Sequence, residues 1–160
     1  MKTAIVYATT HGCTETCVQK LAVKLSGQID RFNLKDKPRI DLSVYDCILI
    51  GGSIHAGRIQ GSVRRFCSKH LTVLVQKHIG LFLCCMEKGD KAQAQFAVAF
   101  PEELRKHATA SGLFGGGFDF ERMNFIQKAI TKKVAKIDRT VFDIDESAIG
   151  KFVSDLTENA

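Results

Sequence analysis

A run of hydroxyl-bearing residues follows the first apolar segment of the chain and is its strongest chemical signal. Residues 5–14 read Ile-Val-Tyr-Ala-Thr-Thr-His-Gly-Cys-Thr, which predicts a strand, a turn at Gly12 and a helix from about Thr14. The hydroxyls of Thr9, Thr10 and Thr14 are hydrogen-bond donors. An exposed Gly12 amide and the first amides of the helix would add to them. Since the turn contains neither Lys nor Arg, these donors alone would hold a phosphate monoester; the alternative is a threonine-capped helix without a ligand.

Two common phosphate-binding patterns are missing from the chain. The sequence has neither the G-x-x-x-x-G-K-[ST] pattern of triphosphate-binding loops nor the G-x-G-x-x-G pattern of dinucleotide-binding domains. Because those glycines and that lysine hold a di- or triphosphate against the backbone, their absence argues against a nucleoside triphosphate or NAD as the ligand of this turn.

Histidine and cysteine residues are the other candidates for chemistry. His55 lies in a glycine-rich segment, where it would steer a proton near neutral pH or be an ordinary surface histidine. Cys84 and Cys85 are adjacent, and because neighbouring strand residues point to opposite faces, we expect inert thiols rather than a redox pair. Cys13 and Cys17 have helical i, i+4 spacing, but the sequence places no third or fourth ligand near them, so no metal site is predicted.

Strands and helices alternate along the chain. Strand-like runs occupy residues 3–8, 28–33, 46–53, 79–85 and 111–115, with a weaker sixth at 140–143, and helical patterns fill 14–26, 61–75, 92–109, 120–137 and the segment after Asp145. The region 92–109 is two helices or one kinked helix, because Pro101 interrupts it. Near-continuous apolar strands are buried on both faces, which favours a parallel sheet. We therefore predict one doubly wound α/β domain spanning residues 1–160.

The ligand of such a sheet lies beyond the carboxyl ends of its strands, at the point where the strand order reverses. Three segments besides the threonine turn end there, at residues 51–57, 84–89 and 115–120. We expect a phosphate at the turn and a planar ring between the segments that follow the third and fourth strands. The triple glycine at 115–117 would allow a close backbone approach to a ligand or a turn with positive φ.

The chain resembles the flavodoxin-type FMN proteins. The phosphate signature of that family (apolar, apolar, aromatic, any, Thr, any, any, Gly, any, Thr) falls on residues 5–14 without a mismatch. More narrowly, the segment Gly-Gly-Ser-Ile-His-Ala-Gly at residues 51–57, followed by Phe66, Lys69 and His70, is similar to the menaquinone-dependent protoporphyrinogen IX dehydrogenases.

The resemblance implies a flavodoxin-like five-stranded parallel sheet in the order 2-1-3-4-5, with helices on both faces and FMN as the cofactor. It places the phosphate in the threonine turn and the ring against the segments at 53–57 and 84–89, with His55 as the candidate catalytic residue. The residues expected to bind the cofactor are Thr9, Thr10, His11, Gly12, Cys13, Thr14, Ser53, Ile54, His55, Ala56, Gly57, Cys85, Met86, Glu87, Gly89, Gly116 and Gly117.

The formal net charge of +6 favours an anionic partner or surface. Nucleic acid is not expected, because the chain has no Trp, two Tyr and no basic run interleaved with aromatics. In the helix expected at 120–137, the apolar side chains of Met123, Ile126, Ala129, Ile130 and Val134 would face inward and four lysines outward. That cationic face would rest on anionic lipid or lie in solvent.

Localisation follows from what the chain contains. It has no apolar run long enough to span a membrane and no signal peptide. Its six cysteines fall largely in apolar segments, which is typical of buried thiols in a reducing compartment. We expect a cytoplasmic protein, with any peripheral contact made by the basic helix at the inner face of the membrane.

Three functions stay open. Ordinary electron carriers of the family are acidic and flank the flavin with Trp and Tyr, whereas this chain is basic and offers Ile54, His55 and Met86. That difference favours an FMN-dependent dehydrogenase that takes electrons from a small molecule, such as protoporphyrinogen IX in heme biosynthesis, and gives them to a quinone. The alternatives are a flavodoxin-like carrier that docks a protein acceptor and a flavin-free regulatory module. The sequence does not predict an oligomeric state.

Overall fold

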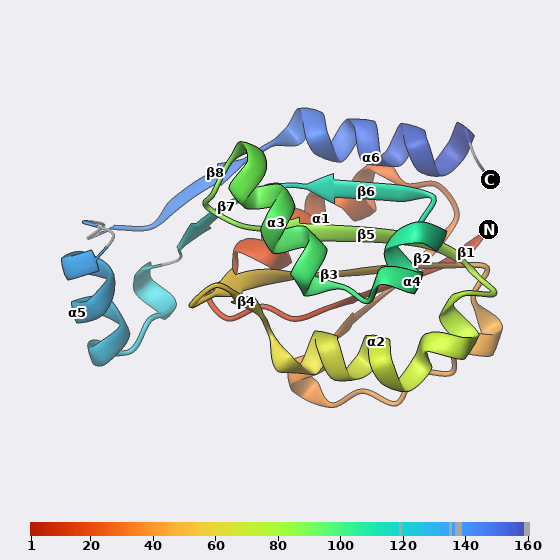
Figure 1. The fold of residues 1–160 in the computed structure, drawn as a ribbon, viewed down its shortest axis with the longest axis horizontal. Helices are drawn as coiled ribbons and strands as arrows, with labels where there is room; N and C mark the ends of the chain where they lie inside the picture. The colour runs from red at the N-terminus through yellow and green to blue at the C-terminus, as the bar shows by residue number, and fades with distance from the viewer. Residues whose placement is uncertain (119, 135, 137–138, 159–160) are drawn as a thin grey trace.

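A parallel sheet forms the centre of the protein in this computed structural model, which describes residues 1–118, 120–134, 136 and 139–158 (Figure 1). The strand order is β2-β1-β3-β5-β6, and every neighbouring pair on this path is parallel. The strands are β1 (Lys2–Tyr7), β2 (Gln28–Asn33), β3 (Cys47–His55), β5 (His78–Cys84) and β6 (Ala110–Leu113). Because β4 (Arg58–Ile59) is a short strand off this path, the predicted order 2-1-3-4-5 of the parallel strands is confirmed.

Helices cover both faces of the sheet. On one face α1 (Cys13–Lys24) and α6 (Glu146–Glu158) pack on the strands, and on the other lie α2 (Gly61–Leu74), α3 (Gly89–Ala99) and α4 (Glu102–His107). Two helices therefore flank Pro101, which resolves the choice left open for residues 92–109. Short 3-10 turns at Leu34–Asp36 (η1) and Leu42–Val44 (η2) connect β2 to β3.

The strands are buried on both faces, as their unbroken apolar runs predict. In β1, Ala4 and Val6 belong to the core under α2, α3 and α4, whereas Ile5 belongs to the core under α1 and α6. The alternation continues in β3, where Ile48 and Leu49 lie on opposite faces. Since side chains alternate along a strand, each apolar run contributes to two cores at once.

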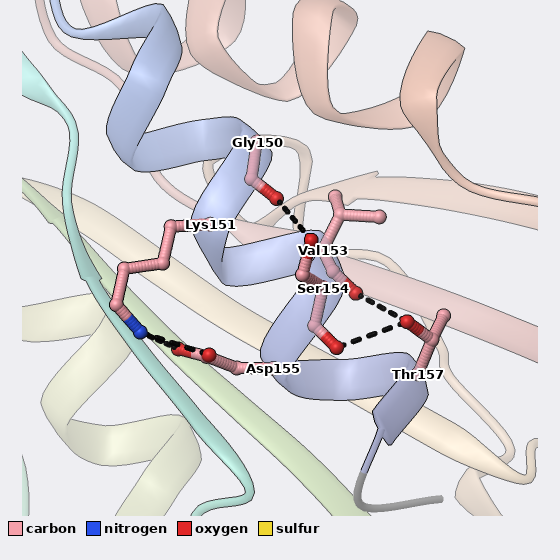
Figure 2. Close-up of polar contacts among 6 residues, drawn as sticks. All are labelled: Gly150, Lys151, Val153, Ser154, Asp155 and Thr157. Atoms are coloured by element: carbon pink, nitrogen blue, oxygen red, sulfur yellow. Dashed lines mark hydrogen bonds and ion pairs between the residues drawn. The ribbon is translucent and has the colours of Figure 1, made fainter.

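The last helix, α6, begins at the cap that the sequence predicts. The Asp145 carboxylate accepts a hydrogen bond from the Ala148 amide at 2.9 Å. Figure 2 shows local polar contacts along the helix: Lys151 pairs with Asp155 at 2.7 Å, Ser154 donates to the Gly150 carbonyl, and Thr157 donates to the carbonyls of Val153 and Ser154. At the start of the helix, Glu146 pairs with Lys20 of α1 at 2.6 Å. The buried face of α6 supplies Ile149, Phe152 and Leu156 to the core.

The segment after β6 differs from the prediction. β7 (Gly115–Phe118) and β8 (Val141–Ile144) pair with each other as an antiparallel hairpin outside the main sheet, so residues 140–143 do not form a sixth strand of it. The long helix expected at 120–137 is a 3-10 turn, η3 (Phe120–Arg122), followed by the shorter α5 (Phe125–Val134). The Gln127 amide donates to Asn124 Oδ1 at 2.9 Å, and the Asn124 amide donates to Gln127 Oε1 at 3.1 Å. These two bonds cap the N-terminus of α5 and separate it from η3.

We call the described residues from β7 to β8 the β7–β8 lobe; in Figure 1 its helix α5 projects beyond the end of the sheet. The predicted inward face of this helix is wrong, because the helix does not pack on the sheet. Ile126, Ala129, Ile130 and Val134 are exposed, and of the expected inward residues only Met123 is buried. Ile137, at the end of the expected helix, lies outside the described residues.

Candidate functional site

The threonine turn joins the end of β1 to the start of α1. Gly12 adopts a left-handed conformation (φ 83°) that lets the chain enter the helix, and its carbonyl accepts the Thr16 amide at 3.0 Å. The Gly12 amide donates to Thr9 Oγ1 at 3.0 Å, so the expectation of an exposed Gly12 amide is wrong. Because Thr9 accepts this bond, its hydroxyl hydrogen stays directed elsewhere and can donate to a ligand.

Thr14 is the residue of the turn that most clearly fits a bound anion. Its side chain is fully buried in the first turn of α1, and Oγ1 has no hydrogen-bond partner among the described residues. A buried hydroxyl without a partner costs about 1–3 kcal/mol. The first-turn amides of α1 also lack intrahelical acceptors. An anion at the turn would satisfy both, so these donors fit the phosphate of FMN.

The threonine turn forms the first wall of the site. The second wall is a hairpin, because the strand expected at 46–53 continues beyond residue 53. β3 runs on to His55, turns through Ala56 (φ 48°) and Gly57 (φ 76°), and pairs antiparallel with β4 (Arg58–Ile59). This extension holds the Ser53 and His55 side chains on a strand. Ala56 and Gly57 form the tip of the hairpin and do not line the cavity described below, because the chain reverses at them.

Gln60 ties the hairpin to the threonine turn and is a residue that sequence reasoning missed. Its amide nitrogen donates to Ser53 Oγ at 2.7 Å and to Thr10 Oγ1 at 3.3 Å, while its oxygen accepts the Ser53 amide at 2.9 Å. Gln60 precedes α2, so nothing in the local pattern distinguishes it from a helix-flanking residue. Thr10 is thereby held as an acceptor, at the side of the turn that faces the hairpin.

Two histidines meet between the turn and the hairpin. The rings of His11 and His55 contact edge to face, with centroids 5.0 Å apart, and His55 Nε2 lies 3.3 Å from Ser53 Oγ. Burial, and after it the charge of His11, lowers the pKa of His55. The ring of His55 is therefore neutral at pH 7 and suited to accept or relay a proton rather than to carry a fixed positive charge.

The third wall combines the end of β5 with the start of β7. The Cys85 amide donates to the Gly115 carbonyl at 2.8 Å. A Cβ on Gly116 would lie 2.6 Å from the backbone of Cys85, so only glycine allows these two segments to touch. Gly115 also has a positive φ of 78°. The structure thus accounts for the triple glycine by chain packing as well as by the turn that the sequence predicts.

The three walls enclose a small cavity of about 20 Å³. It is lined by His11, Cys13, Ser53, Ile54, His55, Cys84, Cys85, Met86, Gly116 and Gly117, all of them predicted site residues except Cys84. This volume is close to that of one water molecule. A flavin ring would therefore require wall side chains to move, and the contacting rings of His11 and His55 stand between two of the walls.

Two predicted residues of the third wall lie elsewhere. Glu87 and Gly89 line a separate surface pocket of about 530 Å³ together with Lys88 and Asp143. Lys88 pairs with Asp143 at 3.4 Å across this pocket. Since the chain turns away from the cavity after Met86, a role of Glu87 and Gly89 in cofactor binding stays a prediction that the described geometry does not support.

The cysteines are arranged partly as predicted. Cys84 and Cys85 belong to the cores on opposite faces of the sheet. This confirms the prediction that their side chains point to opposite faces of the strand. The expectation that Cys13 and Cys17 have no further ligand nearby is wrong, because the sulfur of Cys84 joins them. Local sequence patterns do not reveal this contact, because β5 and α1 are far apart in the chain and meet only in the folded protein.

The parallel sheet, its strand order and the ligand loops at the strand ends define a flavodoxin-type α/β domain. Residues 4–145 match the model of the flavodoxin domain family, and the chain belongs to that family. Membership in it supports the predicted cofactor, FMN.

Individual proteins agree with this assignment. The structure is similar to oxidised flavodoxin 1 from Bacillus cereus (TM-score 0.62, 18% identity, 100% of this chain and 99% of that one). It is also similar to the Fusobacterium nucleatum flavodoxin bound to flavin mononucleotide (TM-score 0.52, 14% identity, 99% and 98% of the chains). In sequence, the chain is 24% identical over 170 residues to a protein of Leishmania major named protoporphyrinogen IX dehydrogenase [quinone], covering 96% of this chain and 74% of that protein.

Proposed function

We propose that this protein is an FMN-dependent dehydrogenase that takes electrons from a reduced small molecule of the protoporphyrinogen IX type and delivers them to a quinone. The observation that carries the proposal is the buried Thr14 hydroxyl at the start of α1, which has no partner among the described residues, together with a cavity lined from the start of α1 and the ends of β3 and β5. The name of the Leishmania major relative supports the choice of substrate and acceptor. Such an activity would place the protein in heme biosynthesis.

The chain's own residues would share the work in two parts. Thr9 and Thr14, with the first amides of α1, would bind and orient the phosphate. Ser53, Ile54 and His55 on one side and Cys85 and Met86 on the other would flank the ring and exclude water from it. FMN, when bound, supplies the ability to accept two electrons and pass them on. His55, neutral at pH 7, would accept the proton that leaves the donor.

The surroundings of the cavity favour a small-molecule donor over a protein partner. Met86 lines the cavity and is about half exposed, so its flexible apolar side chain would meet a substrate at the rim. Basic side chains lie on the hairpin side of the site: Arg58 pairs with His55 across the β3–β4 hairpin and, with Arg64, lines a pocket of about 260 Å³. Cations on this side of the site suit an apolar substrate that carries carboxylates.

An anaerobic redox titration tests this activity. With FMN bound, protoporphyrinogen IX should bleach the flavin absorbance, and a menaquinone analogue should restore it. A porphyrinogen ester that lacks free carboxylates should react more slowly. Bleaching only by a reductase protein, and restoration only by a protein acceptor, would contradict the dehydrogenase and support the electron carrier.

A quinone dissolved in a membrane would require the protein to approach a lipid surface, and the β7–β8 lobe suits this. Phe125 (87% exposed), Val134 (77% exposed), Ile126 and Ile130 extend from α5 without packing on the sheet. Lys133 is exposed on the same helix, whereas Lys128 and Lys132 lie over the Phe120 ring at 5.3 and 5.7 Å. Exposed apolar residues mixed with lysines are typical of helices that lie on anionic lipid.

No helix of the described residues has the length and apolar character needed to cross a membrane. We therefore propose a peripheral contact, at the inner face of the membrane.

Sedimentation with vesicles tests this contact: anionic vesicles should carry the protein down, and Phe125→Ser should reduce this binding. Val23→Ser, which changes an equally exposed side chain on α1, is the matched control and should bind as the unchanged protein does. Equal binding of both variants would contradict the lobe as the contact.

A further inference from the structure

Three cysteine sulfurs meet under the threonine turn. Cys13 and Cys17 lie one helical turn apart on α1, and Cys84 is the last residue of β5. Their sulfur atoms all lie within 4.8 Å of one another. Among the described residues no His, Asp, Glu or further Cys joins the group, so it offers three thiols and nothing else.

The group is buried among apolar side chains yet has a route to the outside. Cys13, Cys17 and Cys84 are each at most 4% exposed and belong to the core under α1 and α6, which includes Leu21 and Phe82. Cys13 and Cys84 also line the cavity of about 20 Å³ between the three walls. An ion that enters this cavity therefore meets two of the three sulfurs first.

The three thiols are coupled to one another. Hydrogen bonds from the thiols of Cys17 and Cys84 hold the pKa of the Cys13 thiol well below its usual range. The hydrogen bond with Cys13, together with burial, raises the pKa of Cys17 and of Cys84. Cys13 is also the first residue of α1, where the helix N-terminus favours a thiolate, so one thiol of the group ionises readily while the other two keep their protons.

Charge decides which ion such a site would hold. Three thiolates around Cu(I) would leave two net negative charges in an apolar core, and around Zn(II) one, which is costly without a counter-charge. Zn(II) also favours a fourth ligand, and the cluster supplies only three. A trivalent ion with three thiolates is neutral, so it is the form that this buried site accommodates best.

We propose that Cys13, Cys17 and Cys84 form a three-thiolate binding site for a trivalent thiophilic ion, with arsenous acid as its simplest source. Three S–H bonds and three As–O bonds break, three As–S bonds form, and the three protons leave with the three hydroxyl groups as water. Nothing is oxidised or reduced. The adduct pulls the start of α1 towards β5, which couples the site to the threonine turn.

Native mass spectrometry of the full-length protein, reduced with a phosphine, tests the proposal with arsenite as the probe. We expect one arsenic atom per chain and a mass gain equal to arsenic less three protons. Arsenic held by two thiols and one hydroxyl would be heavier by one water. Zn(II) in the same assay should bind more weakly than arsenite.

Variants locate the site. Cys17→Ala should give the two-thiol adduct and lose arsenite affinity by more than about 100-fold, since losing even a residue that supports a ligand typically costs 10- to 100-fold. Cys67→Ala, in the opposite core, is the matched control and should bind like the unchanged chain. If a variant fails to fold, the mass of the adduct in the unchanged protein still decides between three thiols and two.

Four results would overturn the proposal: no arsenic uptake, a two-thiol adduct in the unchanged protein, tighter binding of Zn(II) than of arsenite, or unchanged binding by Cys17→Ala. None of these results depends on flavin content or enzymatic activity, so the site and the proposed dehydrogenase function fail separately.

Discussion

The two halves of the candidate cofactor site are built differently. At the threonine turn, backbone geometry places the donors: Gly12 bends the chain, and Thr14 sits in the first turn of α1 with its hydroxyl unpartnered among the described residues. At the ring walls, side chains define the space, and the His11 and His55 rings contact each other across a cavity of about 20 Å³. We infer that a phosphate at the turn would meet donors that the backbone already places, whereas a ring would require the wall side chains to rearrange.

This difference assigns separate roles to the two halves. A preformed anion site contributes affinity without a rearrangement cost, because its donors lose little freedom on binding. If the walls of the ring half must open, this step slows the association of FMN and favours ligands whose shape fits the opened space. Changes in the turn should therefore alter how tightly FMN is held, and changes in the walls should alter how fast it enters.

The largest expected effect comes from Thr14→Val, which removes the hydroxyl and keeps the shape. FMN affinity should fall by about 1.5–3 kcal/mol, the usual contribution of a hydrogen bond to a charged group. The same substitution should stabilise the flavin-free protein by about 1 kcal/mol, because it removes a buried polar atom without a partner. Fluorescence titration with FMN and urea unfolding measure the two effects.

Thr157→Val, near the C-terminal end of α6 (Figure 2), is the control for this substitution and should leave FMN affinity unchanged. A Thr14→Val protein that binds FMN as tightly as the unchanged chain would mean that the phosphate does not contact this hydroxyl.

The second effect concerns the contact between the end of β5 and β7. Gly116→Ala would place a methyl group 2.6 Å from the Cys85 backbone, which cannot move aside as a side chain would. We expect a loss of about 1–3 kcal/mol in the free energy of unfolding. Gly150→Ala is the matched control: no atom lies within 4 Å of the added carbon, and alanine in a helix should stabilise by about 0.5–1 kcal/mol. A Gly116→Ala protein as stable as the unchanged one would refute this tight packing.

A smaller effect is expected from opening the ring half. His55→Ala removes the edge-to-face contact with His11, and contacts of this kind contribute about 0.5–1.5 kcal/mol. The association rate constant of FMN, measured by stopped-flow fluorescence, should rise about 2- to 10-fold. Thr14→Val should leave that rate nearly unchanged and speed dissociation instead. An unchanged rate in His55→Ala would show that the histidines do not restrict entry.

The smallest effect is a pH dependence of stability. Burial, and then the charge of His11, lowers the pKa of His55 below its unfolded value of about 6.5. The unfolded chain therefore takes up this proton first, so the free energy of unfolding falls as the pH drops below about 6.5. Urea midpoints at about pH 7.5 and 5.5 should differ less in His55→Gln than in the unchanged chain. Equal differences would contradict the buried, neutral histidine.

The sequence predicted the parts of the molecule that depend on local pattern. Unbroken apolar strands predicted the parallel sheet, the resemblance to the flavodoxin-type proteins implied its strand order, and Gly12 with its threonines located the turn at α1. The Asp145 cap was also predictable, because it depends on three neighbouring residues.

Features that depend on distant contacts were not predictable. Gln60 reaches Thr10 only because β3 continues into a hairpin, and Cys84 meets Cys13 only because β5 ends under α1. The apolar face of α5 was misjudged for the same reason: its spacing is that of a packed helix, yet the β7–β8 hairpin carries it away from the sheet.

We infer that this chain binds FMN chiefly through the phosphate at the threonine turn. Titration of the purified, flavin-free protein with FMN and, separately, with riboflavin is the decisive measurement, because riboflavin has the same ring and lacks the phosphate. We expect one FMN per chain, with quenched flavin fluorescence, and markedly weaker binding of riboflavin. Equal affinity for the two flavins, or no uptake of FMN, would contradict it.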